Sequence, residues 1–225
     1  MTGRMLVFDM DGVLVDPTQT FRRALIETVR HFCGREMSQA DIVRVKNRGG
    51  YNDDSDIAMR AILEAGVDAD EREVREFGRE LYWGRAGEGY ICDERWLVSS
   101  GTLERLAANQ RLGIFTGRGM RSTQHTLRRF CPQIVFDPIV THEQVEKRKP
   151  APDGLLRIAA AVPGAEIVFV GDNVDDCRAA LGASVRFVGI ASPDTPRHDE
   201  TRRLFEQLGA EAVLESVNDL EDVLQ

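Results

Sequence analysis

The chain has 225 residues, of which 42% are hydrophobic and 29% charged, and its formal net charge at pH 7 is −8. These values predict a folded globular protein, and the acidic balance argues against a nucleic-acid partner. No apolar run approaches the ~18 residues that cross a bilayer, so no membrane partner is expected. The N-terminus shows no secretion signal, and four scattered cysteines lack zinc-site spacing, so we expect a cytoplasmic protein.

The first predicted element is a buried strand over residues 5–8, a short continuous apolar run that ends at Asp9. The next segment contains no convincing strand, but its apolar spacing, Ser38 as an N-cap and Gly66 as a stop predict helices. Four helices are expected near residues 21–32, 38–45, 57–65 and 74–81. We therefore predict a helical cap domain, residues 17–96, inserted into a core formed by residues 1–16 and 97–225.

Buried strand and helix alternate after the insert, which predicts an α/β fold built on a doubly wound, Rossmann-like parallel sheet. Beyond residue 199 we expect a helix, a short strand at 212–214 and a last helix. The expected strands are 112–115, 167–170 and 185–190, and the expected helices are 101–110, 119–130, 153–161 and 175–182.

Polar motifs follow three of the predicted strands, where ligands bind in open α/β sheets. Asp9 and Asp11 follow the first strand, with Gly12 permitting a sharp turn, and Asp172 and Asp176 follow another. A lone Asp after a strand is usually a turn former, but here that interpretation must explain polar motifs at three strand ends at once. So many carboxylates in one place predict a bound cation, and an all-oxygen ligand set favours Mg²⁺.

Groups that suit an anion accompany these carboxylates. Thr116 supplies a hydroxyl, and the amides of Gly117 and Arg118 are expected to open a helix N-terminus that binds phosphate. Lys149 lies in a basic run, but Pro150 and Pro152 restrict its backbone, so we single it out to neutralise Asp9 and a phosphoryl group.

Four motifs occur in the order and spacing of one known family. They are DMDGVLVD at 9–16, FTGR at 115–118, KPAPD at 149–153 and GDNVDD at 171–176. The whole chain resembles the haloacid dehalogenase-like hydrolase superfamily, and the helical insert resembles its subclass with an α-helical cap. That subclass includes phosphoglycolate phosphatase and β-phosphoglucomutase.

The resemblance implies a hydrolase of phosphoric monoesters. It makes Asp9 the nucleophile and a metal ligand, and Asp11 the acid and base whose main-chain carbonyl also binds Mg²⁺. Thr116 and Lys149 would hold the phosphoryl oxygens. Asp172 would bind the metal, and Asp176 would support it or orient Lys149, with its neighbour Asp175 as the other candidate. The family often has a small hydroxyl residue after Asp16; this chain has Pro17, and Thr18 is the alternative.

The segment from Lys46 to Asp54 is the most unusual part of the insert, because two cations and two amides surround a Gly-Gly pair. Related caps place a substrate-reading loop near this point. Lys46, Arg48 and Asn52 are therefore candidates for substrate specificity, with Arg48 first because a guanidinium can clamp a second anionic group. Ordinary helix C-terminal chemistry is an equal alternative.

The expected activity is Mg²⁺-dependent hydrolysis of a small phosphorylated metabolite through a phosphoryl-aspartate on Asp9. A sugar-phosphate mutase, or a phosphonatase with a Schiff base on Lys46, is the alternative on the same fold. A non-catalytic phosphate binder is a third reading, which the acid/base candidate Asp11 disfavours. The sequence identifies neither the substrate nor the oligomeric state.

Overall fold

The computed structural model describes residues 3–50, 53–85 and 87–224. The chain divides into two compact units: a core unit, Met1–Val15 with Trp96–Gln225, and an inserted unit, Asp16–Arg95. These bounds lie one residue from the predicted ones at each crossing. Where the chain crosses, β2 (Val15–Asp16) pairs with β3 (Arg95–Trp96) in a two-stranded sheet.

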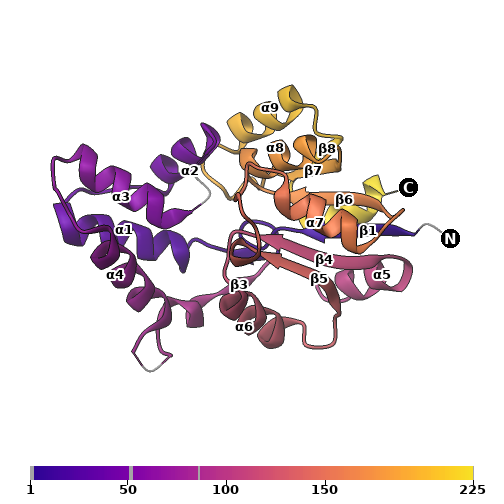
Figure 1. The fold of residues 1–225 in the computed structure, drawn as a ribbon, viewed down its shortest axis with the longest axis horizontal. Coiled ribbons are helices and arrows are strands. Elements are labelled where there is room, and N and C mark those ends of the chain that lie inside the picture. The colour runs from indigo at the N-terminus through magenta and orange to yellow at the C-terminus, as the bar shows by residue number, and fades with distance from the viewer. Residues whose placement is uncertain (1–2, 51–52, 86, 225) are drawn as a thin grey trace. The chain divides into compact units, whose positions relative to one another are not determined.

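The core unit contains a six-stranded sheet in the order β5-β4-β1-β6-β7-β8, and every strand pair in it is parallel (Figure 1). The predicted fold class, a doubly wound α/β sheet, is confirmed. The strands are β1 (Arg4–Phe8), β4 (Arg111–Thr116), β5 (Phe136–Thr141), β6 (Glu166–Gly171), β7 (Arg186–Ile190) and β8 (Ala212–Leu214). Because β1 lies between β4 and β6, the ends of these three strands meet at the point where the strand order reverses.

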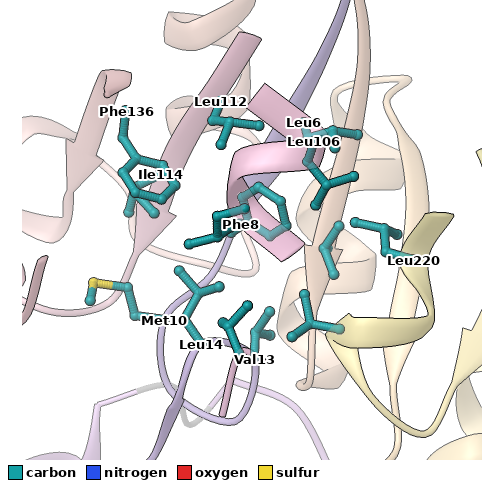
Figure 2. Packing of buried hydrophobic residues seen from close by; sticks show 14 of the residues in the cluster. Leu6, Phe8, Met10, Val13, Leu14, Leu106, Leu112, Ile114, Phe136 and Leu220 are labelled. Carbon is teal, nitrogen blue, oxygen red and sulfur yellow. The ribbon is translucent and has the colours of Figure 1, made fainter. Parts of the chain in front are cut away.

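Both faces of the sheet are buried under apolar clusters. Successive residues of a strand point to opposite faces, so each strand contributes to both clusters. Leu6 and Phe8 of β1 join one apolar cluster, and Met5 and Val7 join another. Figure 2 shows the first cluster, with Phe8 surrounded by side chains of the sheet and of α5. The first cluster is covered by α5 (Thr102–Asn109), α6 (Met120–Phe130) and η3 (Val217–Val223), and the second by α7 (Asp153–Ala161), α8 (Val174–Gly182) and α9 (His198–Leu208).

The strand β5 was not predicted. Its sequence includes Asp137 and Pro138, which interrupt the apolar run that marks the other strands. It lies at the edge of the sheet, where a proline is tolerated, and its register against β4 shifts between Leu112 and Ile114. The last predicted helix is the 3-10 segment η3 rather than an α-helix.

The inserted unit is helical and has an apolar core of its own, to which Leu25, Val29, Ile42 and Ile62 belong. Ser38 and Asp41 form a capping box that starts the second helix, as the sequence predicted for Ser38. Its helices are α1 (Phe21–Cys33), α2 (Gln39–Asn47), α3 (Asp54–Glu64) and α4 (Glu71–Trp83). Among the residues described, no helix is long and apolar enough to cross a membrane.

Candidate active site

A tight loop follows β1 and holds the first two carboxylates of the site. The main-chain oxygen of Met10 accepts hydrogen bonds from Leu14 and Val15 at 2.8 and 2.9 Å. Gly12 has a φ of +78°, and a Cβ on it would lie 1.9 Å from Oδ2 of Asp172. Only glycine suits this position, because it adopts the left-handed conformation and lets Asp172 approach the loop.

Three carboxylates meet at the ends of β1 and β6. Asp9, Asp172 and Asp176 each offer an oxygen, and these oxygens all lie within 4.8 Å of one another. A Cβ on Gly171 would come within 2.5 Å of the Asp176 side chain, so this glycine also permits the approach. The donor set is hard oxygen throughout, which fits a Mg²⁺ or similar ion that would offset the repulsion.

Asp176, rather than Asp175, belongs to this cluster. Its Oδ2 accepts a hydrogen bond from the Asn173 amide at 3.0 Å, which caps α8. Asp175 is fully buried and lies 3.7 Å from the Arg178 guanidinium instead. The cap therefore fixes the orientation of Asp176 toward Asp9 and Asp172.

Lys149 is buried against two of these carboxylates. Its Nζ lies 3.2 Å from Oδ1 of Asp9 and 2.7 Å from Oδ1 of Asp176. The same ammonium lies over the rings of Phe115 and Phe169, at 4.7 and 5.1 Å from their centroids. Two carboxylates and two aromatic faces thus hold one cation at the site.

Burial and charge shift the pKa values of this pair. Burial raises the pKa of Asp9 to about 6; Lys149 opposes that rise, while Asp176 and Asp11 add to it. Burial would lower the pKa of Lys149, but its attraction to Asp176 and Asp9 outweighs this and raises the pKa. The ammonium form of Lys149 is therefore favoured, which is the form that offsets negative charge.

The hydroxyl of Thr116 is buried at the end of β4, where it accepts a hydrogen bond from the Arg118 amide at 3.2 Å. No acceptor for its own proton is found within the described part of the chain, so the hydroxyl can donate to an anion.

The predicted helix N-terminus is displaced. The helix α6 begins at Met120, whose amide donates to Glu143 at 2.9 Å, and the Arg118 amide is bonded to Thr116. The expectation that the Gly117 and Arg118 amides open this helix was therefore wrong for both residues. The Gly117 amide, outside the helix, remains a candidate for binding phosphate.

The side chain of Arg118 has a partner that sequence reasoning missed. Its guanidinium donates to both carboxylate oxygens of Asp11, from Nε at 2.9 Å and from Nη2 at 2.6 Å. Asp11 thus projects toward Arg118 and is not one of the three clustered carboxylates. Nothing local in the sequence signals a contact across 107 residues; Phe115 and Phe169, flanking Lys149, were missed for the same reason.

The candidate specificity residues lie in the inserted unit. The Nζ of Lys46 lies 2.8 Å from Asp54 in an ion pair, and Arg48 is exposed just beyond α2. Asn52 lies outside the described residues. Thr18 donates its amide to Asp16 at 2.9 Å, which gives its main chain a turn-forming role.

Comparison with known proteins agrees with this geometry. A family model described as haloacid dehalogenase-like hydrolase matches residues 4–184. An imidazoleglycerol-phosphate dehydratase of Phytophthora nicotianae is 29% identical over 93% of this chain, and the match spans about half (49%) of that relative's length. A phosphoglycolate phosphatase of Cereibacter sphaeroides is 24% identical over 81% of this chain and 82% of its own length.

A solved structure supports the fold in the same way. The crystal structure of a predicted phosphoglycolate phosphatase from Haemophilus somnus has a TM-score of 0.76 and 22% identity, and the match covers 100% of this chain and 99% of that one. The residues matched by the family model include all four motifs, from Asp9 to Asp176. On the sheet order, the carboxylate cluster and this match together, the chain belongs to the haloacid dehalogenase-like hydrolase family.

Proposed function

We propose that the protein is a Mg²⁺-dependent phosphatase that hydrolyses a small phosphorylated metabolite through a phosphoryl-aspartate on Asp9. The observation that carries the proposal is the position of the Asp9 carboxylate, 3.2 Å from the Lys149 ammonium and within 4.8 Å of carboxylate oxygens of Asp172 and Asp176. A carboxylate beside both a cation and a metal site is suited to attack phosphorus, because the charge of the phosphate ester is offset there.

The reaction has two steps. An oxygen of Asp9 forms a bond to phosphorus while the ester P–O bond breaks, and the proton of the Asp11 carboxyl moves to the leaving oxygen. Water then attacks phosphorus and the bond to Asp9 breaks; one proton of the water moves to Asp11, and its oxygen and other proton stay on the phosphate. The net result is one ester and one water converted to one alcohol and one phosphate.

The groups around Asp9 hold the phosphoryl oxygens. Thr116 donates its hydroxyl, Gly117 its amide, and Lys149 its ammonium, which Asp176 and two aromatic rings keep in place. Asp9, Asp172 and Asp176, with the main-chain carbonyl of Asp11, would hold the metal, whose chemistry is to neutralise charge on the phosphoryl oxygens.

Support for the substrate class comes from the relatives. A phosphoglycolate phosphatase aligns over 82% of its length, and phosphoglycolate is a small anionic phosphomonoester. The dehydratase relative is about twice as long as the matched segment, so its activity is not transferred to this chain. We propose that the inserted unit acts as a cap that selects the substrate through Lys46, Arg48 and Asn52.

The proposal is tested by phosphate release from a panel of small phosphomonoesters, with Mg²⁺ and with EDTA. We expect release only with Mg²⁺, and its loss in Asp9→Asn. Labelled phosphate should become bound to the wild-type protein as an acid-stable, hydroxylamine-labile group. An Asp9→Asn variant as active as the wild type would refute the mechanism, and isomerised product without phosphate release would identify a mutase instead.

A phosphonatase is disfavoured by one observation. A Schiff base needs a neutral lysine amine, whereas Lys46 forms an ion pair with Asp54 at 2.8 Å, which stabilises the ammonium form.

A further inference from the structure

The contact between Arg118 and Asp11 is a two-pronged ion pair inside the core unit. Nε of Arg118 donates to one oxygen of Asp11 at 2.9 Å and Nη2 to the other at 2.6 Å. The Arg118 side chain is 1% exposed and that of Asp11 26% exposed. The guanidinium is thus buried beneath a carboxylate whose outer side reaches the surface of the site.

Arg118 is itself fixed at both ends. Its Nη1 donates to the Thr126 hydroxyl of α6 at 2.9 Å, and its amide donates to Thr116 at 3.2 Å. The strand β4 and the helix α6 therefore hold the guanidinium in one place, and a fork with two parallel bonds fixes the plane of its partner.

These contacts separate Arg118 from the phosphate-binding groups. Nε, Nη1 and Nη2 each donate to Asp11 or Thr126, so each of the three nitrogens has a protein partner. A carboxylate has about four lone-pair sites, so a fork of two hydrogen bonds is compatible with a proton on Asp11.

We propose that Arg118 is a positioning residue that fixes the Asp11 carboxyl group for proton transfer; this inference rests on the proposed phosphatase function. Asp11 gives its proton to the leaving oxygen as the ester P–O bond breaks and the bond to Asp9 forms. It regains a proton from the water that displaces Asp9 from phosphorus. Arg118 contacts neither the phosphoryl group nor the leaving group and acts through Asp11.

The experiment uses two substrates that differ in their need for an acid. An alkyl phosphate has a strongly basic leaving oxygen that must be protonated, whereas the nitrophenolate of 4-nitrophenyl phosphate leaves without a proton. In Arg118→Gln we expect kcat/KM for the alkyl phosphate to fall about 10²-fold, the scale set by misplacing a catalytic group. The value of kcat/KM for 4-nitrophenyl phosphate should change little. Nitrophenolate should appear as a burst, because the second step, in which Asp11 takes a proton from water, is slowed.

Three companion variants sharpen the test. Arg118→Lys keeps the charge but not the fork, so its loss should be intermediate. In the Asp11→Asn background, Arg118→Gln should cause no further fall, because coupled residues are not additive. Arg128→Gln, which changes an exposed arginine of α6, should match the wild type. If Arg118→Gln does not fold, Thr126→Val should show the same leaving-group dependence on a smaller scale.

The outcomes separate this inference from the function beneath it. If the wild type releases no phosphate from either substrate, the proposed function fails and the inference falls with it. If the wild type is active but Arg118→Gln loses equal activity on both substrates, or only raises KM, then Arg118 binds phosphate or maintains structure, and the positioning role is refuted.

Discussion

At the scale of single residues, two buried carboxylates of the site share one buried ammonium group. Asp9 and Asp176 share the single ammonium of Lys149, and Asp172 adds a third carboxylate oxygen nearby. Removing water from these groups is unfavourable, which is why burial raises the pKa of Asp9 to about 6. An arrangement suited to binding a cation and an anionic ester is thus obtained at a cost in stability.

We predict that Asp9→Asn abolishes activity and yet stabilises the fold. The pKa of Asp9 is higher in the folded chain than the ordinary value of 3.8, so the folded state binds a proton more tightly than the unfolded state. An ionised Asp9 therefore lowers the free energy of unfolding, and this penalty is complete above about pH 6. It shrinks as the pH falls from about 6 toward 3.8, the pKa in the unfolded chain, and is absent below that. In EDTA at pH 8, the substitution should raise the free energy of unfolding by about 1–3 kcal/mol.

Urea denaturation of both proteins at pH 8 and pH 4 measures this difference. Asp137→Asn is the matched control, because its side chain is 79% exposed and the same charge is removed at the surface. The explanation is refuted if Asp9→Asn is no more stable than the wild type at pH 8, or if its advantage is as large at pH 4.

At the scale of elements, the loop after β1 depends on a glycine for two separable reasons. Gly12 has a φ of +78°, and its missing side chain leaves space for Asp172. We predict that Gly12→Ala lowers the free energy of unfolding by about 1–2 kcal/mol, because alanine is strained in the left-handed conformation. It should also weaken Mg²⁺ binding more than about tenfold, because the new Cβ displaces the metal ligand Asp172.

The control for this prediction is Gly209→Ala. Gly209 has a φ of +86°, and a Cβ on it would have no atom within 4 Å. Both variants should lose similar stability in thermal melts, but only Gly12→Ala should lose affinity in a Mg²⁺ titration. Equal Mg²⁺ affinities in the two variants would show that the contact with Asp172 is unimportant.

The elements that could be predicted from the sequence are those whose signal is local. Strands β1, β4, β6 and β7 are continuous apolar runs, and Ser38 marks its helix start through one hydrogen-bonding side chain. The edge strand β5 lacks that signal, because Asp137 and Pro138 interrupt it. Edge strands contact fewer neighbours, so their sequences are less constrained toward apolar residues.

The same distinction applies to the site. Motifs at strand ends predict which residues gather, because parallel strands bring their carboxyl ends to one edge. They do not predict which side chains pair there. The choice of Asp176 over Asp175 depends on a helix cap, and the fork from Arg118 to Asp11 depends on side-chain reach across the sheet.

At the scale of the whole molecule, the core unit and the inserted unit each bury an apolar cluster of their own. The three clustered carboxylates belong to the core unit alone. A ligand that binds only the folded state stabilises the part of the chain that forms its site. Mg²⁺ should therefore stabilise the core unit and leave the inserted unit unchanged.

The chain has two tryptophans, one in each unit, so each unit can be observed separately. Trp96 stacks on Phe130 in the core unit, with ring centroids 5.3 Å apart, and Trp83 contacts Tyr82 in the inserted unit. Fluorescence melts of Trp83→Phe report on Trp96, and those of Trp96→Phe report on Trp83. We expect Mg²⁺ at 100 times its Kd to raise the Trp96 transition by about 5–10 °C and to leave that of Trp83 in place.

Adding Asp172→Asn to the Trp83→Phe protein removes a carboxylate from the cluster and should abolish the shift, which ties it to the metal site rather than to ionic strength. Equal shifts at both tryptophans would mean that the two units unfold as one cooperative body, contrary to the separate cores. A shift that survives Asp172→Asn would mean that Mg²⁺ binds elsewhere, and it would remove the support that the carboxylate cluster gives to a metal-dependent reaction.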